Sequence, residues 1–240
     1  MRYENAGELL PPELLEQVQN YVSGALLYIP AKAERKPRGD SSYRQWIKKR
    51  NQIIVNSFRY GESIRQLAED HFLSEETVRK IVYSRKNGEK LVFRPVLSSA
   101  EEYREAGLLE VWAYTYMAFE RCHRKFADAL YRSEQHYFGP ITLPTAWVHR
   151  NTGPEKEMRW RISREVFERE TDRWLCRLEE SAALPPMLIG YEDARFVVNC
   201  HNPMLEALRR RNIAEFPFIV RTDAEGLPAL QKVHPEICRV

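Results

Sequence analysis

The chain has 240 residues, which is enough for one large domain or two domains of ordinary size. Its cysteines form no CxxC pair and lie at no metal-ligand spacing from a histidine, so we expect reduced thiols and no metal site. Residues 1–12 lack the apolar core of a signal peptide, and no apolar run approaches the roughly 20 residues that span a bilayer. These features predict a soluble, cytoplasmic protein with no membrane partner.

Charge is unevenly distributed along the chain. The formal net charge is +3, but residues 32–94 contain 16 Lys and Arg against 8 Asp and Glu. Residues 96–240 contain 20 against 22. The N-terminal part is therefore the part that we expect to meet a polyanion.

The first expected helix follows Pro11 and Pro12, which suit a first turn. Its apolar stripe consists of Leu14, Leu15, Val18, Tyr21 and Val22. Residues 26–29 read as a short edge strand. Residues 31–40 (AKAERKPRGD) are basic and rich in turn formers, so we expect a solvated linker, with an arm that lies along phosphates as the alternative.

Residues 43–60 predict a second helix, and residues 63–86 (SIRQLAEDHFLSEETVRKIVYSRK) predict a helix-turn-helix. Ile64, Leu67 and Ala68 give its first helix one apolar stripe. Ser74 stands at the N-cap of its second helix, with acidic residues in the first turn. The buried side of this second helix is expected to contain Val78, Ile81 and Val82.

The opposite side of the second helix has a composition that suits a major groove. Cations reach phosphates or guanine edges, and hydroxyl groups contact either. The residues expected to contact base edges or phosphates are Thr77, Arg79, Lys80, Tyr83 and Ser84. Those expected to hold the phosphate backbone are Lys48, Lys49, Arg50 and Arg85. The alternative is an ordinary helical hairpin with a solvated face.

Two runs in the first 90 residues carry a family resemblance: MRYENAGELLPPELLEQVQNYVSGALLYIP and YRQWIKKRNQIIVNSFRYGESIRQLAEDHFLSEETVRKIV. They resemble the small bacterial proteins related to the phage Mor transcription activator. This resemblance implies binding to double-stranded DNA, commonly as a homodimer.

Residues 100–135 predict one long helix that Gly107 bends. Its stripe at spacings of three and four consists of Leu108, Trp112, Tyr116, Phe119, His123, Phe126 and Leu130. We interpret it as a core helix or a dimer seam rather than a cofactor site.

The sequence after residue 139 predicts a mixture of helices and strands. Strands are expected at residues 141–148, 187–191, 195–199 and 216–221. Ser163 is expected to cap a helix to residue 180, with Val166, Phe167, Trp174 and Leu178 facing inward. Asn202 is expected to cap a further helix at residues 203–211, with Pro203 as its first residue.

The last 100 residues resemble the ParB-like, sulfiredoxin-related superfamily in the order of their elements. Family members place Asp-Gly-Asn-His-Arg, or a similar run, before a helix that continues Leu-Glu-Ala-Leu. The five positions before Leu205 are Cys200, His201, Asn202, Pro203 and Met204, so Asn202 alone matches. The lost arginine and the lost amide at Pro203 weaken a phosphate site at a helix N-terminus. We therefore expect little or no binding of CTP or ATP.

The residues of this degenerate motif, with others from the preceding loop, define a candidate ligand pocket. Its members are Asn199, Cys200, His201, Asn202, Glu155 and Arg161, with His149 as a further candidate. An unreactive cysteine at a strand end is the expectation for Cys200, and an activated thiolate is the alternative. No catalytic residue is assigned.

Together these patterns predict an α+β protein. An all-α helix-turn-helix domain covers residues 1–95, a connecting helix covers 96–137, and a ParB-like α+β domain covers 138–240. The predicted function is a sequence-specific, nucleoid-associated DNA-binding regulator, whose C-terminal domain senses a ligand or binds a protein. The alternative is a nucleotide-dependent phosphotransferase or nuclease that acts in the C-terminal pocket.

Overall fold

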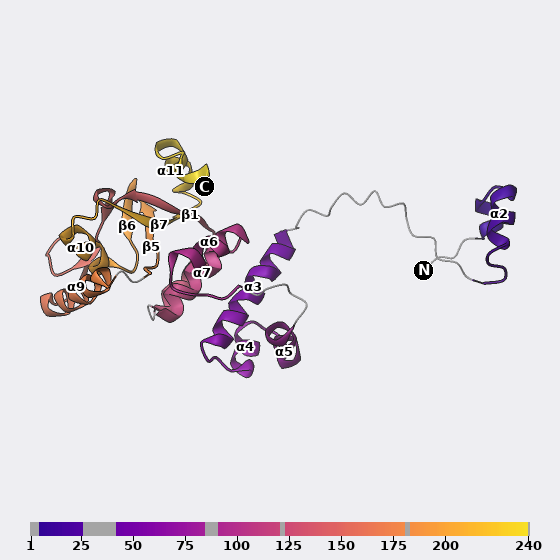
Figure 1. Cartoon of the computed structure of the whole chain (residues 1–240), viewed down its shortest axis with the longest axis horizontal. Coiled ribbons are helices and arrows are strands. Elements are labelled where there is room, and N and C mark those ends of the chain that lie inside the picture. Colours follow the sequence, from indigo (N-terminus) through magenta and orange to yellow (C-terminus); the bar gives the residue numbers. More distant parts are fainter. Residues whose placement is uncertain (1–4, 26–41, 85–90, 121–122, 181–182, 240) are drawn as a thin grey trace. The chain divides into compact units, whose positions relative to one another are not determined.

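The computed structural model describes residues 5–25, 42–84, 91–120, 123–180 and 183–239. The chain forms two compact units, residues 1–42 and residues 43–240. The first unit contains the short helices α1 (Ala6–Leu9) and α2 (Pro12–Gln19), and α2 buries none of its described side chains (Figure 1). The expected strand at residues 26–29 and the linker at residues 31–40 lie outside the described residues.

The second unit begins with the helix predicted at residues 43–60 and the two helices predicted within residues 63–86, and all three helices are confirmed. They are α3 (Ser42–Arg59), α4 (Ile64–Asp70) and α5 (Glu75–Tyr83) (Figure 1). The Ser63 hydroxyl accepts a hydrogen bond from the Gln66 amide at 3.1 Å, and the Ser74 hydroxyl accepts one from the Thr77 amide at 3.2 Å. Both hydroxyl groups satisfy amides that a helix start leaves without partners. Ile54, Leu67 and Val78 are fully buried between the three helices.

The single helix expected at residues 100–135 is wrong. The segment forms α6 (Leu97–Glu105), α7 (Leu109–Thr115), one π-helical turn (Tyr116–Glu120) and α8 (Arg124–Arg132). Gly107 has a φ of 68°, and the Leu108 amide bonds to the Tyr103 carbonyl at 2.7 Å. A left-handed glycine with such a bond ends a helix rather than bending it. His123 and Phe126 are consequently exposed instead of lying on a buried stripe.

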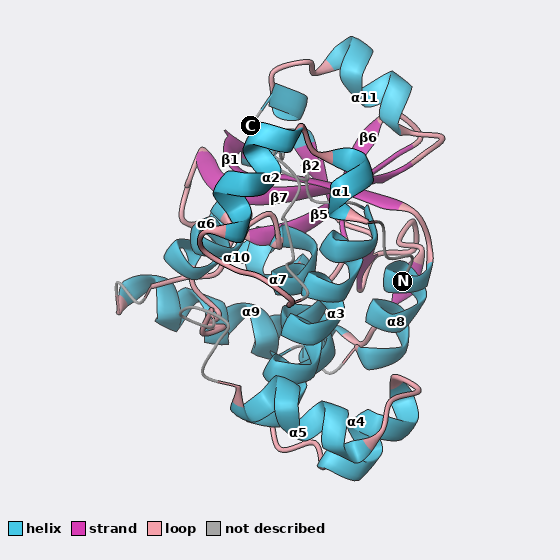
Figure 2. Ribbon diagram, turned by 90° about the vertical axis from the view of Figure 1, so that its right-hand side faces the viewer, coloured by secondary structure: helices cyan, strands magenta, loops and turns pink. Residues whose placement is uncertain are grey.

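A mixed five-stranded sheet forms the centre of the C-terminal part (Figure 2). The strand order is β1 (Gln135–Pro144), β7 (Glu215–Asp223), β5 (Met187–Glu192), β6 (Arg195–Val198) and β2 (Val148–His149). β1 pairs antiparallel with β7, β7 parallel with β5, β5 antiparallel with β6, and β6 parallel with β2. The short strands β3 (Thr152–Gly153) and β4 (Trp160–Arg161) pair separately. The strands predicted at residues 187–191, 195–199 and 216–221 are confirmed with slightly different ends. The single strand predicted at residues 141–148 is wrong, because a 3-10 turn at Thr145–Trp147 separates the end of β1 from β2.

Helices cover both faces of this sheet. Ile189 and Val220 pack in one cluster with side chains of α9 (Arg164–Glu179), α10 (Asn202–Arg210) and α11 (Leu227–Val233). Leu188 and Ile219 point to the other face and pack in the cluster that contains Trp112 of α7. This alternation along β5 and β7 is what a strand buried on both faces requires. Val166, expected to face inward from α9, is 38% exposed.

The fold class is therefore the predicted one, α+β with a helical N-terminal part and a mixed C-terminal part. The compact unit nevertheless runs across the predicted boundaries at residues 95 and 137. A buried polar network joins α3 to the following helices: the Asn56 amide donates to the Thr115 hydroxyl at 2.9 Å, and the Tyr103 hydroxyl donates to the Asn56 side-chain oxygen at 3.1 Å. Such satisfied networks hold packed elements in one arrangement.

Candidate functional site

The outer side of α5 faces solvent, as predicted. Val78 is fully buried and Ile81 is 8% exposed, whereas Arg79 and Lys80 are exposed on the other side of the helix. Tyr83 is 64% exposed and packs edge-on against the Phe58 ring of α3, with 5.7 Å between the ring centroids. This contact holds the Tyr83 ring at the end of the exposed side.

The hydroxyl residues of α5 are only partly available. Thr77 is half-buried, and its hydroxyl lies 2.8 Å from the Ser74 hydroxyl. Ser84 is half-buried at the C-cap, where its amide bonds to the Lys80 carbonyl. Arg85 lies outside the described residues. Of the contact residues predicted on the described part of this helix, the exposed ones are therefore Arg79, Lys80 and Tyr83.

Both cations of α5 form ion pairs within the helix. Arg79 pairs with Glu75 at 2.7 Å, and Lys80 pairs with Glu76 at 2.6 Å. Exposed pairs at this spacing contribute about 0.3–0.5 kcal/mol each, so a phosphate can replace the glutamate at little cost. The four charges cancel, and this side of α5 is polar rather than strongly cationic.

The basic cluster of α3 contacts the protein itself. The Lys48 ammonium donates to the Ala106 carbonyl at 2.6 Å, and Lys49 pairs with Glu110 at 2.8 Å. The Arg50 guanidinium carbon lies 5.0 Å from the centre of the Trp46 ring. Lys49 would have to leave a half-buried pair to reach DNA, so the structure does not support the phosphate contact predicted for it. Lys48 and Lys49 instead join α3 to the end of α6 and to α7, whereas the contacts of Arg50 lie within α3.

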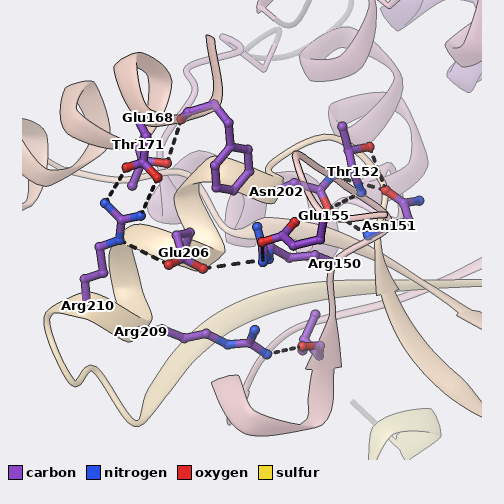
Figure 3. A network of polar contacts seen from close by, with 12 residues as sticks. Arg150, Asn151, Thr152, Glu155, Glu168, Thr171, Asn202, Glu206, Arg209 and Arg210 are labelled. Atoms are coloured by element: carbon purple, nitrogen blue, oxygen red, sulfur yellow. Dashed lines mark hydrogen bonds and ion pairs between the residues drawn. The ribbon is translucent and has the colours of Figure 1, made fainter. Parts of the chain in front are cut away.

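Asn202, expected to be the N-cap of α10, occupies a different place (Figure 3). The helix begins at Asn202, and His201 stands at the N-cap without a side-chain cap bond. The Asn202 side-chain oxygen accepts hydrogen bonds from the amides of Asn151 at 2.9 Å and Thr152 at 3.1 Å. The expected cap is therefore wrong, because the loop after β2 supplies donors that compete for the same oxygen. That loop lies against the start of α10.

A chain of ion pairs fastens the loop to α9 and α10 (Figure 3). Arg150 pairs with Glu155 at 2.6 Å and lies 3.7 Å from Glu206, with its guanidinium carbon 4.8 Å from the Phe167 ring centre. Arg210 continues the chain by bonding Glu206 and, at 2.7 Å, Glu168. Partial burial is the largest single influence and would raise the pKa of Glu155. The hydrogen bonds to its carboxylate and the positive charges of Arg150 and Arg164 together outweigh it, so the pKa lies below its usual value.

The remaining candidates of the C-terminal pocket are not brought together. Cys200 is 7% exposed and His201 is fully buried, with its Nε2 2.5 Å from the Tyr116 hydroxyl. Asn199 is half-buried and its amide nitrogen faces Gly190, whereas Arg161 is exposed on β4. His149 is exposed as well. Glu155 and Asn202 thus share the α10 surface, but the six predicted residues do not line one pocket.

Arg150 is the central residue that the sequence did not reveal. Its side chain is 12% exposed and contacts three elements. An arginine directly after a strand, followed by a polar loop, is a weak signal that many surface loops share. Glu155 is five positions from Arg150, but Phe167 and Glu206 are 17 and 56 positions away, so no local pattern joins all four residues.

Two further features can be stated for the described residues. No group of three or more His, Cys, Asp or Glu side chains among them is arranged to hold a metal ion. In the same part of the chain, no helix combines the length and apolarity that crossing a membrane requires.

Comparison with known proteins gives one informative match. YraL of Bacillus subtilis strain 168, which is described as an uncharacterized protein, is 39% identical over 87 residues. The match spans 100% of that protein and 35% of this chain. No protein-family model matches the chain, and no solved structure matches it.

Proposed function

This chain belongs to the same family as Bacillus subtilis YraL over the stretch that the two share, and we propose that it is a sequence-specific DNA-binding regulator. In this proposal α5 enters the major groove of double-stranded DNA. The observation that carries it is the open outer side of a correctly capped second helix, set on α3 by the buried residues Leu67 and Val78.

The contacts follow from the exposed side chains. Lys80 and Arg79 would exchange their glutamate partners for phosphates or base edges, and Tyr83 would contact the backbone or a base. Thr77 and Ser84, both half-buried, would contribute secondary hydrogen bonds. The resemblance to Mor-like activators supports action as a homodimer, which would bind two half-sites.

The C-terminal part, in the same proposal, is a ParB-like module for ligand sensing or protein interaction that lacks nucleotide chemistry. The start of α10 supports this view, because the amides of Asn151 and Thr152, which could otherwise donate to a phosphate, already donate to the Asn202 oxygen. Pro203 in the first turn removes a further amide donor. A phosphate would therefore meet a helix start that is already covered.

The proposal is tested by selecting bound fragments from genomic DNA and measuring their affinity by fluorescence anisotropy. Lys80→Glu should weaken binding by at least about tenfold, because the new carboxylate repels phosphates. Arg173→Glu is the matched control, since Arg173 also forms an exposed intrahelical pair, with Glu170 of α9. Equal weakening in both variants, or none in Lys80→Glu, would reject α5 as the recognition helix.

A further inference from the structure

A small cavity lies between α7, α8 and β1, away from both surfaces described above. Its volume is about 80 Å³, and its polar lining includes Glu110, Tyr114, Tyr131, Ser133, Gln135 and Tyr137. A water molecule occupies about 30 Å³ of liquid, so the cavity has room for a ligand of about two to four non-hydrogen atoms. Three of its eight lining residues are tyrosines, and Glu110 is its one acidic side chain.

The three tyrosines of the lining provide aromatic rings and hydroxyl groups. Tyr114 and Tyr131 lie with their ring centroids 5.6 Å apart, and the Tyr114 hydroxyl donates to Asp128 at 2.8 Å. Within the described residues, the hydroxyl groups of Tyr131 and Tyr137 make no hydrogen bond to the protein. Burial raises the pKa of Tyr131 and Tyr137, so both hydroxyls stay protonated at neutral pH. A ligand therefore meets neutral rings with polar ends.

Glu110 contributes a negative charge to the lining of the cavity. Its carboxylate pairs with Lys49 at 2.8 Å, and the two side chains are 25% and 29% exposed. Arg221 bonds the lining residue Gln135 and is itself paired with Glu192 at 2.8 Å. Aromatic faces beside a carboxylate form the arrangement that proteins use to bind ammonium groups.

We propose that this cavity binds a small organic ammonium ion, such as methylammonium or dimethylammonium, with Glu110 as its counter-charge and Tyr131 and Tyr137 as its aromatic walls. The ligand competes with Lys49 for Glu110. Because Lys49 belongs to α3, which carries the helix-turn-helix, the bound cation would loosen one of the contacts that hold α3 against α7. Ligand binding itself does not depend on the DNA-binding proposal.

The test is isothermal titration calorimetry of the full chain, without DNA, with dimethylammonium chloride at millimolar concentration. Isopropanol serves as the neutral ligand of similar size, and sodium acetate as the anionic one. We expect saturable heat with dimethylammonium alone. Saturable binding of acetate or isopropanol with equal affinity, or no saturable heat with dimethylammonium, would overturn the proposal.

Three variants separate a binding role from a structural one. Glu110→Gln should weaken dimethylammonium binding by at least about fivefold, and Lys49→Met should tighten it by about as much, since the competing ammonium is removed. Glu102→Gln on α6, whose partner is Arg94, is the matched control and should leave the affinity unchanged. Weaker binding in Lys49→Met, with an unchanged circular dichroism melt, would contradict the competition. If Glu110→Gln does not fold, the affinity of Lys49→Met for dimethylammonium still tests the proposal.

Discussion

Helices α5 and α10 share two sequence features, but their charged side chains have different surroundings in the fold. Both carry arginine and glutamate at helical spacing, and each was expected to start with a small polar cap. On α5 these pairs are exposed and local, as in Arg79 with Glu75. On α10, Arg210 and Glu206 belong to a network that includes Arg150 and the loop after β2. The ion pairs between α10 and other elements stabilise the fold. The exposed ion pairs within α5 are weak, so its side chains can exchange them for contacts with a ligand.

The largest expected effect comes from breaking the α10 network at its centre. Arg150→Met should lower the free energy of unfolding by about 3 kcal/mol, because a guanidinium that is 12% exposed is lost, Glu155 loses its ion-pair partner and Glu206 keeps only Arg210. Arg173→Met, which breaks an exposed pair on α9, should change it by less than about 0.5 kcal/mol. Urea denaturation followed by circular dichroism measures both, and equal effects would show that burial does not distinguish the two pairs.

A smaller loss is expected at the covered start of α10. Asn202→Ala removes the acceptor of two loop amides, so the free energy of unfolding should fall by about 2 kcal/mol. Amide hydrogen exchange should rise at Asn151 and Thr152. Gln66→Ala, which removes an exposed side-chain bond to Asp70, is the control that should leave stability nearly unchanged. Unaltered exchange at the two loop amides would argue against the closure of this site by Asn202.

The cap of α5 should matter less. Ser74→Ala removes the acceptor of the Thr77 amide and should cost about 1 kcal/mol of stability. It should also weaken duplex binding, because the first turn of α5 frays. Ser98→Ala in the first turn of α6, where no side-chain cap bond forms, is the matched control. A larger loss in the control would mean that the Ser74 cap does not hold this helix.

The smallest effect concerns pH. The folded-state pKa of Glu155 is depressed, so the stabilisation from its pair with Arg150 is present above the unfolded pKa and is lost as pH falls through the folded pKa. Wild-type stability should therefore fall more steeply than that of Glu155→Gln as the pH is lowered below about 4.5. Denaturation between neutral and acidic pH tests this. If the unfolding free energies of the two proteins changed in parallel with pH, Glu155 would not contribute to the pH dependence of stability.

The sequence predicted what depends on local pattern. The cap Ser74, the buried stripe through Leu67 and Val78, and the strand around Ile189 are all fixed by neighbours within a few residues. The break at Gly107 was missed because the apolar spacing continues on both sides of it. A glycine's effect there depends on whether the backbone turns left-handed, which spacing does not reveal.

The candidate site was predicted less completely than the fold, because its chemistry depends on contacts between distant residues. Lys49 was read as a phosphate contact, yet its partner Glu110 lies 61 positions away. Asn202 was read as a cap, yet the amides it accepts are those of Asn151 and Thr152. A residue type defines which bonds it can form, and tertiary packing decides which of them it does form.

The salt dependence of duplex binding is the most direct test of whether the exposed side of α5 contacts DNA. For wild type, the logarithm of the association constant should fall linearly with the logarithm of salt concentration, and Lys80→Ala should reduce the magnitude of that slope by about 1 while weakening binding at every concentration. A slope and affinity equal to those of wild type would mean that Lys80 does not contact DNA, and the assignment of α5 to the major groove would then be wrong.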